Sequence, residues 1–471
     1  MAKKQGNIIA IIAMIFLFGM ISFVTNLASP MGDILKNQFG VANWMGTLGV
    51  FANFIAYAVM GYPAGKMLQK KGYKVTALIA ISVGFIGVGI QTLSGVFGSF
   101  GVYLLGAFVA GFSMCLLNTV VNPMLNKLGG GGNKGNQLIQ TGGAFNSLCG
   151  TAVIILTGLL IPKIAEAKIS NVFPLMFAAL AIFAFAFIVI ALTDIPENEP
   201  QPVQAAAEKD GTSLLSFRHF VLGVGAIFVY IGVEVGVPNV LQKWLQNPEL
   251  HILADANPEL GIVNEVADEL VQPIVETVMV EEEVVAPVVA KETISQGGVT
   301  AEAVAGSVAA TYWFLMLIGR LIGAALGSKF SARAMLTVVS AVGLGLIASA
   351  IFVNPENLIN MPTFNGAKGV SLVNVPVNAF LLVLVGLCTS IMWGGIFNLA
   401  VEGLGKYTEK ASGIFMVMVC GGGILTLLQN AIVDYTNNGY GYLNSYWLLV
   451  VCLAYILWYA AFGSKVTKRA N

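Results

Sequence analysis

Polar side chains stand inside otherwise apolar runs of this sequence, and most of them are uncharged amides. An amide offers both a donor and an acceptor, so it suits hydrogen bonding to the hydroxyl groups of a small solute. A polar group in hydrocarbon costs free energy unless it has a partner or a function. We therefore predict a polar substrate-binding site, with hydrogen bonds between helices as the alternative role. The candidates are Asn26, Ser29, Asn118, Asn122, Gln140, Asn146, Tyr230, Glu234, Trp393 and Asn398.

Glu234 is the sharpest of these signals, because it lies near the middle of the apolar stretch YIGVEVGVP. A carboxylate at that depth can bind H⁺ or Na⁺, or it can be a structural acid bonded to neighbouring helices. Both roles stay open from the sequence. Pro238 follows four residues later and could break the helix, which would free backbone carbonyls beside the acid. We predict that Glu234 holds the coupling ion if transport is coupled.

Other chemistry finds little support in the sequence. The five cysteines lie in apolar runs without a CxxC spacing, and there are two histidines. The stretch GGGGNKG at 129–135 has no Ser or Thr after its lysine, so it is not a phosphate-binding loop. We expect no catalytic residues, no metal and no cofactor, and hence not an enzyme.

Composition places the chain in a membrane. Hydrophobic residues make up 57% of its 471 residues and charged residues 10%, whereas soluble domains have roughly 25% charged residues. Lipid must therefore be the solvent for much of the surface. The formal net charge is zero, so no nucleic-acid partner is expected. Apolar stretches long enough to span a bilayer cover approximately 8–35, 42–65, 75–94, 99–123, 138–162, 172–193, 219–245, 302–327, 332–353, 375–400, 411–434 and 444–464.

The basic residues orient these twelve predicted spans. When both termini are assigned to the cytoplasm, 18 of the 24 lysines and arginines fall on the cytoplasmic side, Arg320 counted among them. That bias is typical of cytoplasmic loops. We expect a multi-pass protein of the bacterial cell inner membrane, with N- and C-termini cytoplasmic.

Polar segments divide the helices six and six. We predict an N-terminal six-helix bundle over 1–193, a cytoplasmic linker over 194–217 and a C-terminal bundle over 218–471. The second bundle carries an external insert, 246–300, with eleven acidic residues and one lysine. We interpret the insert as a loop, with partner binding as the alternative. Stretches 54–74 and 314–335 are faintly similar, and repeated halves favour a carrier that rocks around a central site.

Five stretches together resemble the major facilitator superfamily, specifically its fucose and glucose/galactose permease branch. They are PAGKMLQKKGYK (63–74), NTVVNPMLNKLG (118–129), AFNSLCG (144–150), YIGVEVG (230–236) and LAVEGLGKYTEKASG (399–413). The resemblance covers nearly the whole chain except the insert. It implies an all-α membrane protein, with twelve transmembrane helices in two six-helix bundles, alternating access and a hexose-type substrate, often with proton symport.

Stretch 63–74 is similar to the superfamily's helix 2–3 loop motif, which latches the bundles on the cytoplasmic side. The resemblance therefore implies gating roles for Gly65, Gln69, Lys70 and Gly72. Gln69 stands where the motif usually has an acid, which weakens a charge-based latch. Substitutions relative to the branch also reach its polar centre: Ser29 and Asn118 replace carboxylates, and Gly143 replaces a glutamine.

The sequence thus favours secondary active uptake of a hexose-type sugar by alternating access, with H⁺ or Na⁺ as the candidate coupling ion. Loss of the two branch carboxylates leaves an uncoupled carrier or a carrier for another small solute as alternatives. A transporter-like sensor or assembly protein that uses the 246–300 insert is a further alternative. The expected partners are a small-molecule sugar and the lipid bilayer, and we expect a monomer.

Overall fold

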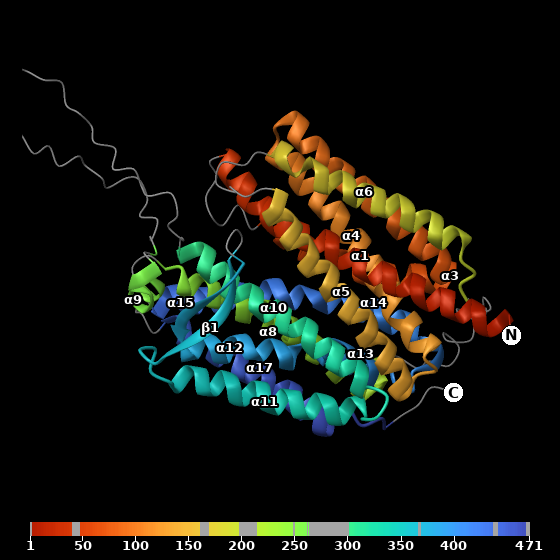
Figure 1. Cartoon of the computed structure of the whole chain (residues 1–471). Helices are drawn as coiled ribbons and strands as arrows, with labels where there is room; N and C mark the ends of the chain where they lie inside the picture. Colours follow the sequence, from red (N-terminus) through yellow and green to blue (C-terminus); the bar gives the residue numbers. More distant parts are fainter. Residues whose placement is uncertain are drawn as a thin grey trace, which may run out of the picture.

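The computed structural model describes residues 2–39, 48–160, 169–196, 214–247, 250–260, 262, 301–365, 369–436 and 441–467. Long helices dominate it, and they run roughly along one direction (Figure 1). Both termini lie at the same end of these helices (Figure 1), which we call the terminal side.

The helices before residue 193 are built from nearly continuous apolar sequence. They are α1 (Ala2–Phe39), α3 (Leu48–Phe97), α4 (Phe100–Leu128), α5 (Gly132–Leu160) and α6 (Ile169–Leu192). The 50 residues of α3 are two helical segments that meet at Gly72, whose φ of 76° and ψ of 179° are not helical. Glycine adopts that positive φ without the clash that a Cβ would cause. The predicted gating position Gly72 is therefore a turn between two membrane crossings.

The helices after residue 214 are more often interrupted. They are α8 (Arg218–Leu245), α10 (Ala301–Leu326), α11 (Ala332–Phe352), α12 (Val377–Thr389), α13 (Met392–Val401), α14 (Thr408–Val417), α15 (Gly421–Thr436), α16 (Gly441–Asn444) and α17 (Tyr446–Trp458). Short irregular joints connect α12 to α13 and α14 to α15, so that each pair makes one crossing. The break between α12 and α13 is at residues 390 and 391, and Ser390 lines the cavity between the two halves.

The number of crossings agrees with the sequence. Ten described stretches are long and apolar enough to span a membrane, and the longest of them, Phe51–Phe97, contains both segments of α3. Helix α5, with 29 residues, is at least as long as most of these stretches but carries many polar residues. It is therefore a further crossing that a criterion based on hydropathy does not detect. The prediction of an all-helical membrane fold with twelve spans is confirmed.

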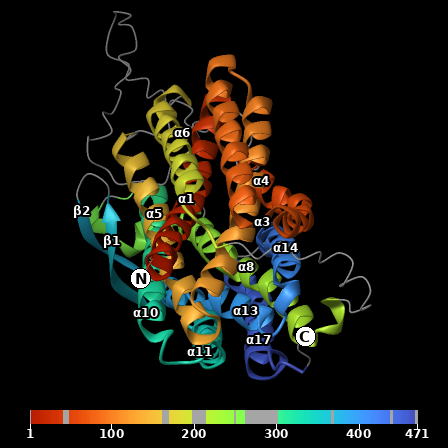
Figure 2. The ribbon, with the colours of Figure 1, turned by 90° about the vertical axis from the view of Figure 1, so that its right-hand side faces the viewer.

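Two groups of helices are visible from both directions. Helices α1, α3, α4 and α6 lie together on one side, and α10, α11, α13 and α17 lie together on the other (Figures 1 and 2). Helix α5 packs against α1 and also against α10 of the other group. We call the helices before residue 193 the first half and those after residue 214 the second half.

A β-hairpin at the end opposite the termini is the element that the sequence does not predict. Strand β1 (Leu358–Asn365) pairs antiparallel with β2 (Gly369–Pro376). The short helix α9 (Ile252–Ala256) and the 3₁₀ turn Pro258–Leu260 belong to the predicted insert, of which residues 263–300 lie outside the described residues. Asn257 ties the two together, since its amide accepts from Asn374 N at 2.8 Å and donates to Asn374 O at 2.9 Å.

Candidate functional site

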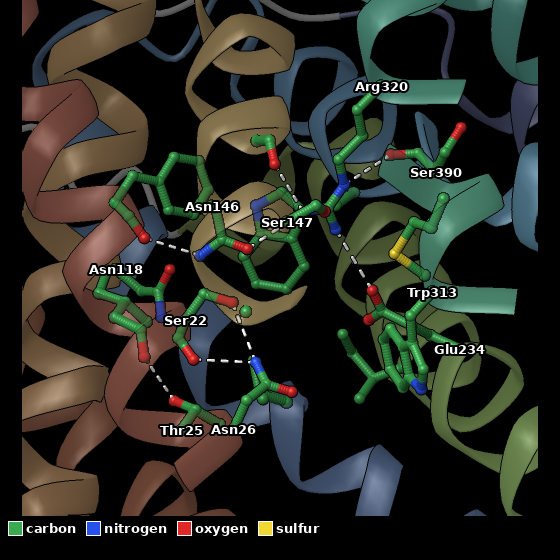
Figure 3. A pocket seen from close by; sticks show the side chains of 18 of the residues that line it. Ser22, Thr25, Asn26, Asn118, Asn146, Ser147, Glu234, Trp313, Arg320 and Ser390 are labelled. Carbon is green, nitrogen blue, oxygen red and sulfur yellow. Dashed lines mark hydrogen bonds and ion pairs between the residues drawn. The ribbon is translucent and has the colours of Figure 1, made fainter. Parts of the chain in front are cut away.

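A cavity of about 240 Å³ lies between the two halves. A single water needs about 10–15 Å³ of such space, so the cavity has room for a hydrated small solute. Figure 3 shows side chains from both halves that point into it. The polar residues that line it are Ser22, Thr25, Asn26, Asn53, Tyr57, Asn118, Gln140, Asn146, Ser147, Thr151, Glu234, Arg320 and Ser390.

The first half contributes an uncharged wall. Asn118 Nδ2 on α4 donates to Tyr57 Oη at 2.8 Å, and Asn146 Nδ2 on α5 donates to Phe18 O at 2.7 Å. On α1, Asn26 Nδ2 donates to Ser22 O at 2.9 Å (Figure 3). These bonds fix the orientation of each amide. The polar wall is therefore ordered before any solute binds.

The second half contributes a buried ion pair. Arg320 Nη2 on α10 lies 3.4 Å from Glu234 Oε1 on α8, and their side chains are 11% and 14% exposed. Arg320 also donates to three neutral oxygens: Nε to Ser390 O at 3.2 Å, and Nη1 to Gly143 O at 2.9 Å and to Asn146 Oδ1 at 3.1 Å (Figure 3). The guanidinium thus joins α10 to α5 of the first half.

Arg320 corrects the charge assignment made from the sequence. Counted there as a cytoplasmic basic residue, it instead lies in the cavity beside Glu234. Gly143 lies directly against it: Gly143 O accepts from Arg320 Nη1, and a Cβ at that position would be in ordinary contact with Arg320 Cδ, at 3.4 Å. The signal that could have identified Arg320 is its place inside the apolar run FLMLIGRLIGAAL, where an ionised group needs a partner.

Several predicted site residues line the cavity directly. They are Asn26, Asn118, Gln140, Asn146, Glu234 and Trp393. Gln140 Nε2 reaches across to the second half and donates to Ile391 O at 3.0 Å, in the break between α12 and α13. This hydrogen bond therefore joins the first half to the second half along this side of the cavity.

Other predicted residues lie behind or beside the cavity. Asn122 is fully buried and accepts a hydrogen bond from Trp393 Nε1 at 3.1 Å, so it orients that ring. Tyr230 is fully buried, with its ring centroid 6.4 Å from that of Trp393. Asn398 Oδ1 accepts from Asn126 Nδ2 at 2.7 Å, nearer the terminal side. The side chain of Ser29 lies outside the described residues.

Sequence reasoning passed over several lining hydroxyls. Ser22, Thr25 and Asn26 share one face of α1, and Ser147 and Thr151 share one face of α5. Spacings of three and four residues bring side chains onto one helix face. That spacing, applied to hydroxyls as well as amides, is the signal that could have found them.

The two halves close against each other on the terminal side of the cavity. Besides the Asn126–Asn398 bond, Ser412 Oγ donates to Thr119 O at 3.2 Å and Tyr73 Oη donates to Glu409 Oε1 at 3.3 Å. Gly65 on α3 crosses Gly413 on α14 so closely that a Cβ on Gly65 would be 2.9 Å from Gly413 Cα. We call this set of contacts the terminal-side seam.

The predicted gating residues divide at this seam. Gly65 is part of it, and Gly72 forms the turn that follows. Gln69 and Lys70 are exposed, and within the described residues neither makes a hydrogen bond or ion pair across the seam. For the described residues, the contacts of the seam include backbone packing, neutral hydrogen bonds and the Tyr73–Glu409 contact.

Comparisons with known proteins agree with this architecture. The sequence model of the protein family 'Major Facilitator Superfamily' matches residues 9–246 of this chain. A glucose/galactose transporter of Brucella abortus biovar 1 is 25% identical over 97% of this chain and 94% of its own length. The L-fucose-proton symporter of Escherichia coli K12 is 21% identical over 95% and 92%.

A solved structure shares the fold over the whole chain. The crystal structure of the transporter FucP in the outward conformation superposes with a TM-score of 0.72 and 18% identity, covering 98% of this chain and 100% of that one. The family resemblance of the sequence is confirmed by the model match and the full-length relatives.

Proposed function

Because the chain belongs to the major facilitator superfamily, whose members are membrane transporters rather than enzymes, we propose that it takes up a neutral hexose-type sugar by alternating access. The relatives that match over nearly the full chain are named for glucose, galactose and L-fucose. Those names support a monosaccharide as the class of solute, and leave the individual sugar to experiment.

The composition of the cavity is the observation that carries this proposal. Its described polar lining consists of amides and hydroxyls plus one acid paired with one arginine, so its net charge is zero. An uncharged polyol can exchange its water for these donors and acceptors at little electrostatic cost. A sugar phosphate or sugar acid would need a cation that is not already paired. The tryptophans Trp313 and Trp393 add apolar faces on which a sugar ring can stack.

The seam supports alternating access around the same cavity. We propose that the half over 1–193 rocks against the half over 218–471, joined by the 194–217 linker, and that the seam opens when the opposite end closes. The termini are then cytoplasmic and the protein lies in the bacterial inner membrane. In the conformation described, the seam closes the cytoplasmic end, which suits loading of sugar from outside.

Glu234 is the proposed site of the coupling ion, and its neighbour favours H⁺ over Na⁺. Arg320 already places a positive charge 3.4 Å from the carboxylate, so a second fixed cation there would be repelled. A proton instead neutralises the acid. Arg320 keeps its three neutral acceptors when Glu234 is protonated, so protonation leaves the hydrogen bonds between α10, α5 and Ser390 in place.

Uptake into proteoliposomes tests the proposal directly. Labelled glucose, galactose and fucose are offered with and without an inward pH gradient, beside a sugar acid and an amino sugar. We expect saturable uptake of at least one neutral hexose, raised by the gradient, and little uptake of the charged sugars. Folded protein that moves none of the neutral hexoses would contradict the sugar assignment, whereas uptake indifferent to the gradient would leave an uncoupled carrier.

A further inference from the structure

A second cavity, of about 510 Å³, lies between the two halves on their membrane-facing side. It is a groove between the first segment of α3 and α15, and we call it the α3–α15 groove. Its walls include Phe51, Ile55 and Ala58 of α3, and Ile424, Leu427 and Ala431 of α15. Both walls belong to stretches that are apolar and long enough to span a membrane.

Phe54 separates this groove from the central cavity, since it lines both. Its ring rests on Gly422, where a Cβ would lie 2.7 Å from Phe54 Cε1. The absence of a side chain at Gly422 therefore makes room for the ring. One aromatic side chain stands between a polar, water-accessible cavity and an apolar groove.

The lining of the groove determines what can fill it. Its walls are almost entirely hydrocarbon, and the exposed fractions of Ile424 (51%) and Leu427 (60%) place that side at the bilayer. Water there would lack the two to four polar partners that a buried water needs. An empty groove would leave its walls without the dispersion contacts that close packing provides. A flexible hydrocarbon chain satisfies both conditions.

We propose that an acyl chain of a bilayer phospholipid occupies the α3–α15 groove and packs against the outer face of Phe54. The chain supports the ring from the membrane side, so the central cavity stays sealed from the bilayer while it is open to water. One wall comes from each half, so any rocking of the halves changes the width of the groove. The acyl chain is therefore a contact through which bilayer composition acts on the conformational cycle.

Photo-crosslinking from the bilayer tests this occupancy. The full chain is placed in nanodiscs of phosphatidylcholine with a diazirine near the middle of one acyl chain, and labelled peptides are mapped by mass spectrometry. We expect labelling of 51–58 and 420–431 to exceed that of the lipid-facing surface of α6, around Phe185 and Ile188, several-fold. Equal labelling of groove and α6 would overturn the proposal, because it would mean ordinary annular lipid.

A groove-filling variant makes the test specific. In Gly423→Leu the new Cβ meets Phe54 Cβ at 3.5 Å and Phe51 Cδ2 at 3.7 Å, which are ordinary contacts, so the leucine extends into the groove. Gly345→Leu on α11 is the matched control, because nothing lies within 4 Å of a Cβ there. Gly423→Leu should lose the groove labelling and keep the α6 labelling, whereas Gly345→Leu should keep both. Groove labelling that survives Gly423→Leu contradicts the proposal.

The role of Phe54 is tested with the same lipid. Phe54→Ala should extend labelling to peptides that line the central cavity, whereas Phe51→Ala, which touches the groove alone, should not. No change in Phe54→Ala would contradict the separating role. Native mass spectrometry that finds a fatty acid or detergent in place of phospholipid would overturn the assigned occupant. None of these measurements requires transport, so their results test the lipid proposal independently of the proposed sugar transport.

Discussion

The two walls of the central cavity hold their polar groups in different ways. The first half presents many neutral amides and hydroxyls, spread over α1, α3, α4 and α5. The second half concentrates its polarity in one ion pair, Glu234 and Arg320, beside two tryptophans. A wall of neutral donors and acceptors distributes binding over several weak bonds, so each is replaceable. A single buried pair is not, because Glu234 without Arg320 is an uncompensated charge. Arg320 without the acid still keeps three neutral acceptors.

This difference assigns separate tasks to the halves. With the proposed sugar as solute, we expect specificity for hydroxyl positions to come from the amide wall, where orientation is fixed by bonds such as Asn118 to Tyr57. The proposed energy coupling belongs to the charged wall. Arg320 links the two tasks, because it touches Glu234 on one side and Asn146 on the other. Substitutions in the two walls should therefore differ in kind as well as in size.

The largest effect is expected for Arg320→Gln. Removing one partner of a buried pair costs about 3–5 kcal/mol, and here the remaining carboxylate, 14% exposed, would lose its only cationic neighbour among the described residues that line the cavity. We expect loss of uptake and a marked fall in Tm of the purified protein. Arg333→Gln is the control, because Arg333 bonds to Ser464 on the terminal side, away from the cavity. The double variant Glu234→Gln/Arg320→Gln should recover stability but not coupled uptake.

Equal Tm values for Arg320→Gln and Arg333→Gln would contradict the view that the buried pair in the charged wall is hard to replace. Failure of the double variant to recover Tm would show that the bonds from Arg320 to Ser390 and Gly143 matter more than the charge.

Glu234→Gln should have the next largest effect, confined to accumulation. The amide keeps the size of the side chain but cannot bind and release a proton, so a coupled carrier can no longer use the pH gradient. We expect concentrative uptake to be lost and sugar exchange between preloaded and external pools to persist. The exposed acid Glu402 supplies the control Glu402→Gln, which should accumulate normally. Normal accumulation by Glu234→Gln would refute the coupling role and leave a structural acid.

A smaller effect is expected on the amide wall. Asn118→Ala removes the bond to Tyr57 Oη and one polar group facing the solute. A neutral hydrogen bond is worth about 0.5–1.5 kcal/mol, which corresponds to a rise in KM of about two- to twelvefold. Coupling to the pH gradient should survive. Asn354→Ala, which changes an exposed amide far from the cavity, is the control. Loss of coupling in Asn118→Ala would show that the amide wall takes part in proton transfer.

Helix number, membrane placement and family were available from the sequence because they depend on long, repeated signals. Runs of about 20 apolar residues define each span, and they place α8, α11 and α17 closely. The β-hairpin was missed because its strands, Leu358–Asn365 and Gly369–Pro376, come just before the predicted span 375–400, which the second strand overlaps, and show no clear alternation. Tertiary contact with α9 through Asn257 stabilises it, and such contacts leave no local pattern.

The candidate site was accessible from sequence only in part. Intramembrane amides and Glu234 could be singled out because each is costly in hydrocarbon. Whether an amide faces the cavity, as Asn118 does, or bridges helices, as Asn398 does, depends on helix rotation that no single span encodes. Arg320 was misplaced because charge counting assigns a basic residue near a span end to a loop. Its partners Gly143 O and Asn146 Oδ1 lie on another helix.

The smallest effect is expected where the two walls meet, at the terminal-side seam. Asn398→Ala removes the bond from Asn126, and interhelical hydrogen bonds in membranes average about 0.6 kcal/mol. That shifts the ratio of closed to open seam by about threefold. With Ser147→Cys as a reporter in the cavity, a membrane-impermeant maleimide applied from the terminal side should react faster by that factor. Asn378→Ala, which removes a buried amide bonded within the second half alone, should leave the rate unchanged. If both variants behave alike, the seam is held by the Gly65–Gly413 crossing, and its amides only bridge helices.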